Sequence, residues 1–172
     1  MPPERPIALL GFPRSGKSTL GQQLAAALGW PWQDSDQLLQ TQMGCAPGVY
    51  IAKHGEAAFR AAENTWLQHW QPTTPVVLST GGGLPCAPER LSLLQHKALT
   101  IWLQLPADLL MQRLWSPPAH ELTTRCSPEA LTHLYHERAH FYRQAEQVLR
   151  LGTEDSASSL KRLLALLKQA QA

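Results

Sequence analysis

The chain has 172 residues, 44% of them hydrophobic, and a formal net charge of +2 at pH 7, so we expect residues 1–172 to form one globular domain. Neither this small charge nor any run of Lys or Arg suggests a nucleic acid or a membrane surface as partner. No apolar stretch approaches the roughly 18 residues that cross a membrane, and the N-terminal MPPERP lacks a signal-peptide core, so we predict a cytoplasmic protein.

Short apolar strands and amphipathic helices alternate along the first half of the chain. A strand at 6–10 ends in a glycine-rich turn, after which residues with helical spacing begin at Thr19. The next predicted elements are a weaker strand at 30–36, a helix at 37–43 that Gly44 to Gly48 ends, a helix at 49–69, and a buried strand that leads into three glycines at 81–83.

The second half continues this alternation and contains one polar insertion. Its predicted elements are helices at 87–96, 106–115, 128–146 and 158–169, with strands at 98–105 and 147–151. The segment SPPAHELTTRCS at 116–127 lies between two of these helices, where we expect a mobile lid. The order predicts a three-layer α/β/α fold with a five-stranded parallel sheet, whose ligands bind beyond the carboxyl ends of the strands.

The strongest motif is GFPRSGKS at 11–18, which fits the phosphate-loop pattern G-x-x-x-x-G-K-[ST] between a strand and a helix. Its glycines let backbone N–H groups turn toward phosphate oxygens, and the helix that follows adds its positive N-terminal end. Lys17 is placed to reach the β- and γ-phosphates, and the Ser18 hydroxyl to ligate Mg²⁺. We therefore predict a P-loop kinase fold that binds ATP and Mg²⁺. The predicted nucleotide-binding residues of the loop are Gly11, Arg14, Ser15, Gly16, Lys17, Ser18 and Thr19.

Two aspartates follow the second predicted strand. Asp34 and Asp36 are two residues apart, so at an extended strand end both carboxylates point toward the phosphate loop. One carboxylate can orient water bound to Mg²⁺, and the other can accept the hydrogen bond of an alcohol that attacks phosphorus. Either residue alone is also a good N-cap for the helix at 37–43, and the two roles are compatible.

Two arginines are candidates for binding an anionic acceptor. Arg60 has Glu56 and Glu63 at helical spacings of four and three, so ion pairs on a helix surface are the alternative interpretation, as they are for Arg138. An anionic substrate favours Arg because its planar fork binds a carboxylate through two hydrogen bonds. The glycines at 81–83 allow the backbone to approach a small ligand, although a tight turn would also explain them.

Taken together, these motifs resemble the shikimate kinases, a branch of the P-loop proteins related to the nucleoside-monophosphate kinases. The likeness runs from Ile7 to about Leu151, in the family's order and spacing. It consists of GFPRSGKST, DSD at 34–36, GEAAFRAAE at 55–63, GGG at 81–83 and ERAHFY at 137–142. The resemblance implies ATP-dependent phosphorylation of shikimate to shikimate 3-phosphate, a step of aromatic amino acid biosynthesis, by a protein that we expect to be a monomer.

The resemblance also implies roles for individual residues. Arg60 and Arg138 would bind the carboxylate of shikimate, Asp36 its reacting hydroxyl, and Asp34 would help to place Mg²⁺. Arg113 would lie against the adenine ring, where cation–π stacking contributes about 1 kcal/mol. The implied acceptor-binding residues are Asp36, Arg60, Gly81, Gly82, Gly83 and Arg138.

The lid departs from the family pattern. Shikimate kinases usually carry Arg-Pro-Leu-Leu or Arg-Pro-Thr-Leu there, with an Arg that closes over the phosphate in transfer, whereas this chain has His120-Glu121-Leu122-Thr123. Loss of such a cation removes several kcal/mol of transition-state stabilisation. Three residues are candidates to replace it: Arg125, Arg14 and a protonated His120. Arg125 is favoured by its position, so it joins Lys17 and Asp36 as a predicted catalytic residue.

Other interpretations stay open at this point. The altered lid is compatible with a kinase of another hydroxy acid such as gluconate, or with a kinase-like protein that binds nucleotide and has weak or lost turnover. The spacing of His133, His136 and His140 superficially suits zinc, but no acidic or cysteine partner accompanies them at matching spacing.

Overall fold

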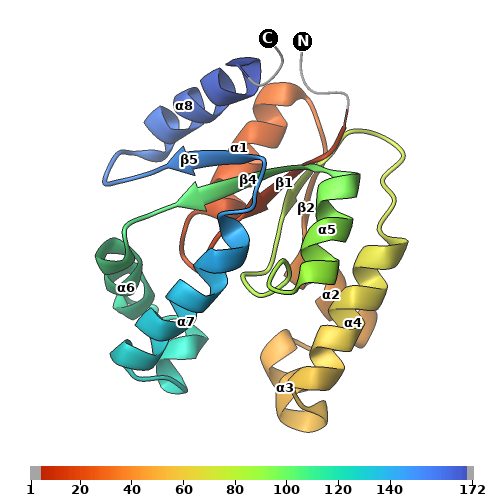
Figure 1. Ribbon diagram of the computed structural model, residues 1–172, viewed down its shortest axis with the longest axis vertical. Coiled ribbons are helices and arrows are strands. Elements are labelled where there is room, and N and C mark those ends of the chain that lie inside the picture. Colours follow the sequence, from red (N-terminus) through yellow and green to blue (C-terminus); the bar gives the residue numbers. More distant parts are fainter. Residues whose placement is uncertain (1–4, 170–172) are drawn as a thin grey trace.

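The computed structural model describes residues 5–169, in which helices cover both faces of a five-stranded sheet (Figure 1). The strands are β1 (Ile7–Leu10), β2 (Trp32–Asp34), β3 (Val77–Ser79), β4 (Leu99–Gln104) and β5 (Gln147–Arg150). They are all parallel and lie in the order β2-β3-β1-β4-β5. This sheet confirms the predicted fold class.

The helices connect successive strands. They are α1 (Lys17–Leu28), α2 (Ser35–Met43), α3 (Pro47–His54), α4 (Glu56–His69), α5 (Pro88–Lys97), α6 (Ala107–Trp115), the 3₁₀ turn η1 (Glu121–Thr124), α7 (Pro128–Tyr142) and α8 (Ser156–Gln169). Within residues 5–169, no helix is both long and apolar enough to cross a membrane.

Two hydrophobic cores lie on opposite faces of the sheet, because alternate residues of a strand point to opposite faces. Ile7 and Leu9 of β1 face α1 and α8, where they pack in one cluster with Leu24 and Leu163. Ala8 and Leu10 face the other way, in a cluster formed with side chains of α4, α5, α6 and α7. Figure 1 shows these helices on the two sides of the sheet. Burial on both faces explains why the central strands read as uninterrupted apolar runs.

The strand order places three functional segments beside one another. The chain leaves β1 for β2 on one side of the sheet, and after β3 it crosses to β4 on the other side of β1. Ligands of open parallel sheets bind at such a reversal of strand order, beyond the carboxyl ends of the strands. The phosphate loop follows β1, the aspartates follow β2 and the three glycines follow β3, so all three segments meet at this edge.

Several predicted boundaries need correction. The predicted helix at 49–69 is two helices, because Gly55 between α3 and α4 has φ 87° and ψ 161°, which only glycine adopts readily. The segment at 116–127, which we call the lid, contains the turn η1. The helix predicted at 128–146 ends at Tyr142. Asp36 is not at a strand end but in the first turn of α2.

Candidate active site

The phosphate loop, residues 11–18, connects β1 to α1 and brings its polar groups toward a common centre. Helix α1 begins at Lys17, after Gly16 in the left-handed conformation with φ 98°. Ser15 is almost fully buried, and its Oγ has no hydrogen-bond partner among residues 5–169. Such an unpaired buried hydroxyl in a loop next to a helix N-terminus fits a site for phosphate oxygens.

Lys17 is a buried cation in the centre of this loop. Its Nζ donates hydrogen bonds to the carbonyl oxygens of Gly11 and Phe12, at 2.8 and 2.9 Å. An ammonium has three N–H donors, so one remains for a phosphate oxygen. Burial lowers the pKa of Lys17 to about 8, while the carboxylates of Asp36 and Asp34 act in the opposite direction. The lysine is therefore still mostly protonated at neutral pH.

A cavity of about 520 Å³ lies against the loop and is lined by most of the residues predicted for nucleotide binding, though not by Gly11 or Ser15. Its lining is Arg14, Gly16, Lys17, Ser18, Thr19 and Arg113, with Ser116 of the lid. Arg113, on α6, donates hydrogen bonds to the carbonyl oxygens of Arg14 and Gly152, each at 3.5 Å. It also lines an adjoining cavity of about 150 Å³ together with Leu151 and Gly152. The structure therefore brings Arg113 next to the phosphate loop, and its stacking on the adenine ring stays a prediction.

Asp34 caps α2 and also contacts the phosphate loop. Its Oδ1 accepts hydrogen bonds from the backbone N–H groups of Asp36 and Gln37, at 2.9 and 3.2 Å, which caps α2. The cap orients the carboxylate so that Oδ2 accepts a hydrogen bond from the Ser18 hydroxyl, at 3.2 Å. Hydroxyl and carboxylate oxygens are the ligands that Mg²⁺ prefers, so this pair fits a magnesium site.

Asp36 lies between the phosphate loop and the glycine turn. A Cβ added at Gly81 would come within 2.4 Å of its Oδ1. The surrounding protein desolvates the Asp36 carboxylate, and this, followed by the neighbouring charges of Asp34 and Glu63, raises its pKa to about 6. The positive charges of Lys17 and Arg60 oppose the shift. A carboxylate with this pKa is suited to accept a proton from an alcohol near neutral pH.

The three glycines form the turn on which the predicted acceptor site is built. A Cβ at Gly81 would meet the Asp36 carboxylate, and one at Gly83 would lie 2.5–2.8 Å from the Arg60 guanidinium. One at Gly82 would lie 2.8 Å from Cδ of Pro13 and 3.2 Å from Nη1 of Arg138. Each glycine thus allows close approach of one predicted acceptor-binding side chain. A tight turn alone would not explain why all three positions lack a Cβ.

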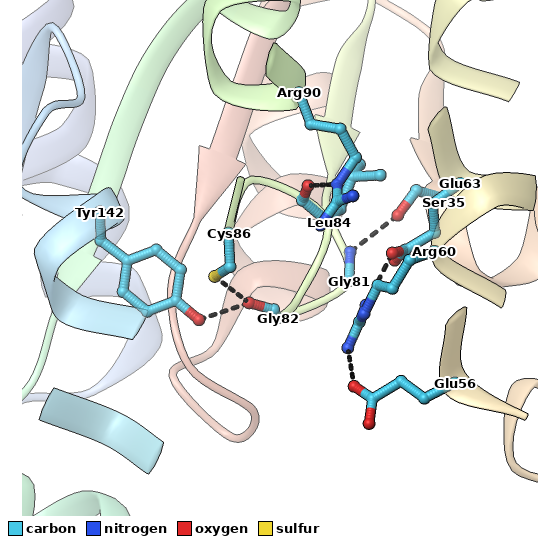
Figure 2. Close-up of polar contacts among 10 residues, drawn as sticks. All are labelled: Ser35, Glu56, Arg60, Glu63, Gly81, Gly82, Leu84, Cys86, Arg90 and Tyr142. Atoms are coloured by element: carbon cyan, nitrogen blue, oxygen red, sulfur yellow. Dashed lines mark hydrogen bonds and ion pairs between the residues drawn. The ribbon is translucent and has the colours of Figure 1, made fainter. Parts of the chain in front are cut away.

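Two glutamates hold Arg60 in place (Figure 2), and its guanidinium lies close to Gly83. Its Nη1 donates to Glu63 at 2.6 Å, and its Nη2 donates to Glu56 at 3.1 Å. The helical ion pairs considered from the sequence therefore exist. However, the Glu63 side chain is only 1% exposed. The pair is therefore not a solvent-exposed surface ion pair, and it fixes the position of the guanidinium.

Arg138, on α7, completes an acceptor cavity of about 290 Å³, which is lined by Glu56, Arg60, Gly83, Cys86, Leu134, Glu137, Arg138 and Phe141. Its guanidinium lies 5.6 Å from the centre of the Phe12 ring, in a cation–π contact that orients it. The cavity therefore has two guanidinium groups, from α4 and α7, which suits a small carboxylate.

The lid does not bring Arg125 into either cavity. A Cβ at Gly48 of α3 would lie 3.0 Å from both Nη2 of Arg125 and Oε2 of Glu121, so these two exposed side chains lie against α3. In contrast, Arg14 donates a hydrogen bond to the Pro118 carbonyl and ties the lid to the phosphate loop. The lid therefore contacts the phosphate loop on one side and α3 on the other.

Several supporting residues were missed from the sequence. The Ser35 hydroxyl accepts the Gly81 N–H at 2.7 Å, and the Tyr142 hydroxyl donates to the Gly82 carbonyl at 2.5 Å (Figure 2). Both residues are fully buried. Both residues lie within the motifs DSD and ERAHFY, which is a hint, but a buried hydroxyl that supports a distant turn has no sequence pattern of its own.

Comparison with known proteins identifies the family. Residues 13–168 match the family model described as shikimate kinase. A shikimate kinase of Synechococcus sp. (strain JA-3-3Ab) is 39% identical over 156 residues, which are 90% of this chain and 82% of that protein. The crystal structure of shikimate kinase from Bacteroides thetaiotaomicron matches with a TM-score of 0.86 and 29% identity, over 96% of this chain and 99% of that one. Shikimate kinase from Acinetobacter baumannii in complex with shikimate matches with a TM-score of 0.86 and 26% identity, over 96% and 94% of the two chains.

The parallel sheet, the phosphate loop and the neighbouring cavity with two arginines define a P-loop kinase of a small molecule. The family model covers most of the chain, and the relatives match it over most of their own length. The chain belongs to the shikimate kinase family, which confirms the family that the motifs predicted.

Proposed function

We propose that this chain transfers the γ-phosphoryl group of ATP to a hydroxyl of shikimate. The observation that supports this acceptor best is the glycine turn at 81–83, which lets Asp36, Arg60 and Arg138 approach one backbone segment. The two guanidinium groups of the acceptor cavity would bind the carboxylate of shikimate. Asp36, a carboxylate of raised pKa beside Gly81 of the same turn, would accept the proton of the reacting hydroxyl.

The residues proposed for the nucleotide side are those of the phosphate loop with Thr19 and Arg113. Lys17 keeps a donor for the β- and γ-phosphates, and Ser18 with Asp34 would hold Mg²⁺. When bound, the ion neutralises phosphate charge. We also propose that the protein works as a monomer.

An ADP-release assay with shikimate, gluconate and other hydroxy acids tests the proposal. We expect turnover with shikimate and identification of a monophosphate ester by mass spectrometry. Arg60→Ala and Arg138→Ala should each raise the KM for shikimate, by about 2–4 kcal/mol when expressed as free energy, and leave the KM for ATP nearly unchanged. Turnover of another acid in preference to shikimate would refute the acceptor assignment.

A further inference from the structure

The Gly82 carbonyl accepts hydrogen bonds from two side chains that come from different parts of the chain (Figure 2). The Tyr142 hydroxyl, on α7, donates to it at 2.5 Å, and the Cys86 thiol, which follows the glycine turn, donates to it at 3.4 Å. A carbonyl oxygen has two lone pairs, so both donors bind it at once. The two contacts fix the direction in which this carbonyl points.

Both donors keep their protons near neutral pH. Burial raises the pKa of Tyr142 well above its usual value and also raises the pKa of Cys86, although the charge of Arg138 opposes both shifts. The Tyr142 side chain is fully buried in the core beside Trp102, with the two ring centres 6.1 Å apart. The packed ring therefore holds the hydroxyl at the Gly82 carbonyl.

The direction of this carbonyl decides where the next N–H group points. The Gly82–Gly83 peptide is trans, so the Gly82 carbonyl and the Gly83 N–H point in opposite directions. The carbonyl points toward Tyr142, and Figure 2 shows Tyr142 and Arg60 on opposite sides of the turn. Gly83 lines the acceptor cavity, and its N–H has no hydrogen-bond acceptor among residues 5–169. The N–H is therefore available to a ligand in that cavity.

We propose that Tyr142 is a positioning residue for the acceptor, because its hydroxyl, assisted by the Cys86 thiol, holds the Gly82–Gly83 peptide with the Gly83 N–H directed into the acceptor cavity. This inference rests on the proposed function and adds a residue to the same site. An anchor is needed because a peptide between two glycines changes its direction easily. Helix α7 thus supplies both Arg138, which lines the cavity, and Tyr142, one turn later, which lies behind it.

Tyr142→Phe removes the hydroxyl and keeps the ring that packs in the core. The thiol that remains is a weak donor, so the peptide spends part of its time in other directions. A site that is competent for only a fraction of the time binds its ligand more weakly by that fraction. We expect the KM for shikimate to rise at least about fivefold, while kcat and the KM for ATP stay within about twofold of the parent.

Tyr135→Phe is a matched control on the same helix. The Tyr135 side chain is buried in the same core, and its hydroxyl donates to the Leu105 carbonyl at 3.2 Å, where Leu105 lines neither cavity of the site. Each substitution removes one buried hydrogen bond, so each should lower Tm by about 2–4 °C. Only Tyr142→Phe should raise the KM for shikimate. Equal KM values for shikimate in the two variants would overturn the proposal.

The contribution of Cys86 is measured by combining two substitutions. In Tyr142→Phe or in Cys86→Ala, the other donor still binds the Gly82 carbonyl. The double variant leaves this buried carbonyl without either donor, so the KM for shikimate should rise by more than the product of the two single effects. Single effects that simply multiply would show that the two donors do not hold the same peptide, and would overturn the role given to Cys86.

The anchor itself can be tested without turnover. In protein labelled with carbon-13 at the glycine carbonyls, the Gly82 resonance should move in Tyr142→Phe and stay in place in Tyr135→Phe. An unmoved Gly82 resonance in Tyr142→Phe would overturn the proposal whatever the acceptor is. A parent protein that turns over no shikimate, with the Gly82 resonance moved as expected, would instead refute the proposed function.

Discussion

At the residue scale, the site depends on carboxyl and ammonium groups whose pKa values differ from those of free side chains. Desolvation raises the pKa of Asp36 to about 6 and lowers that of Lys17 to about 8. Each shift disfavours the charged form, which is the form needed to accept a proton or to bind phosphate. Catalytic groups are poised near neutral pH by such shifts.

The Asp36 carboxylate should set the acid side of the pH profile. Because its pKa is raised, the base is lost as the pH falls through about 6 rather than through 4. We expect kcat/KM for shikimate to fall about tenfold per pH unit below this value, and Asp36→Asn to lower kcat at least about 10²-fold with no such fall. Initial rates at fixed ionic strength between pH 5 and 8 test this, and an inflection near 4 in the parent would contradict it.

The glycine turn allows a second prediction at this scale. In Gly83→Ala the new methyl would lie 2.5–2.8 Å from the Arg60 guanidinium, which cannot retreat easily because the buried Glu63 holds it. We expect the KM for shikimate to rise at least about tenfold, or 1.4 kcal/mol, with the KM for ATP unchanged.

Gly48→Ala is a matched control for that change. Its methyl also meets an arginine, but Arg125 and Glu121 are exposed and can move away. Steady-state kinetics with each substrate varied should therefore show little effect of Gly48→Ala. An equal rise of both KM values in Gly83→Ala would indicate general damage to the sheet edge rather than loss of acceptor binding.

At the scale of elements, the strands and most helices follow from local patterns. The apolar runs of β1, β3 and β4 are buried on both faces, and the phosphate loop has its own spacing, so a periodicity argument finds them. The break at Gly55 was missed because the helical spacing of apolar residues continues through it. Only the backbone angles show that α3 and α4 are separate.

The site was predictable to the extent that its residues belong to contiguous motifs. Asp34, Arg60 and Arg138 were identified in this way, and the structure brings them to one edge of the sheet. The direction of Arg125 was not predictable, because it depends on where a polar lid rests against α3, and the lid has no apolar pattern to fix its register. The bracing hydroxyls of Ser35 and Tyr142 depend on contacts 46 and 60 residues away in the chain.

The contact between the lid and α3 predicts the effect of removing Arg125. Its side chain is exposed and lies against Gly48 of α3. We therefore expect it to stabilise the contact between the lid and α3 rather than the phosphoryl group. Exposed contacts of this kind are worth about 0.2–1 kcal/mol. We expect Arg125→Ala to raise the KM for shikimate by about twofold to threefold. A fall in kcat of more than about tenfold would restore Arg125 as the lid cation.

At the scale of the whole molecule, the active site lowers the stability of the fold that carries it. Lys17 is 9% exposed and lies at the start of α1, where burial of its ammonium group disfavours the charged form. Natural proteins tolerate such local costs at functional sites because the rest of the chain compensates. Here the two clusters on either face of the sheet provide that compensation.

Lys17→Met should therefore abolish activity while changing stability in a direction that depends on pH. The pKa of Lys17 is lowered from 10.5 to about 8 on folding. Between pH 8 and pH 10.5 the unfolded chain therefore binds more protons at this residue than the folded chain does. The charged lysine thus destabilises the fold by about 3 kcal/mol below pH 8, and this penalty disappears as the pH rises toward 10.5. Methionine removes the charge but also two hydrogen bonds, at about 1 kcal/mol each.

The net expectation is that Lys17→Met is about 1 kcal/mol more stable than the parent at pH 7 and about 1 kcal/mol less stable at pH 9.5. Thermal unfolding at both pH values measures this, since 1 kcal/mol shifts Tm by about 2–4 °C for a chain of this size. The rate of ADP release should fall more than tenfold in the same variant, because a phosphate-binding charge is worth at least about 1.4 kcal/mol. A Tm difference that does not change with pH would show that burial does not destabilise the charged form of Lys17. Full activity of the variant would show that Lys17 does not bind phosphate.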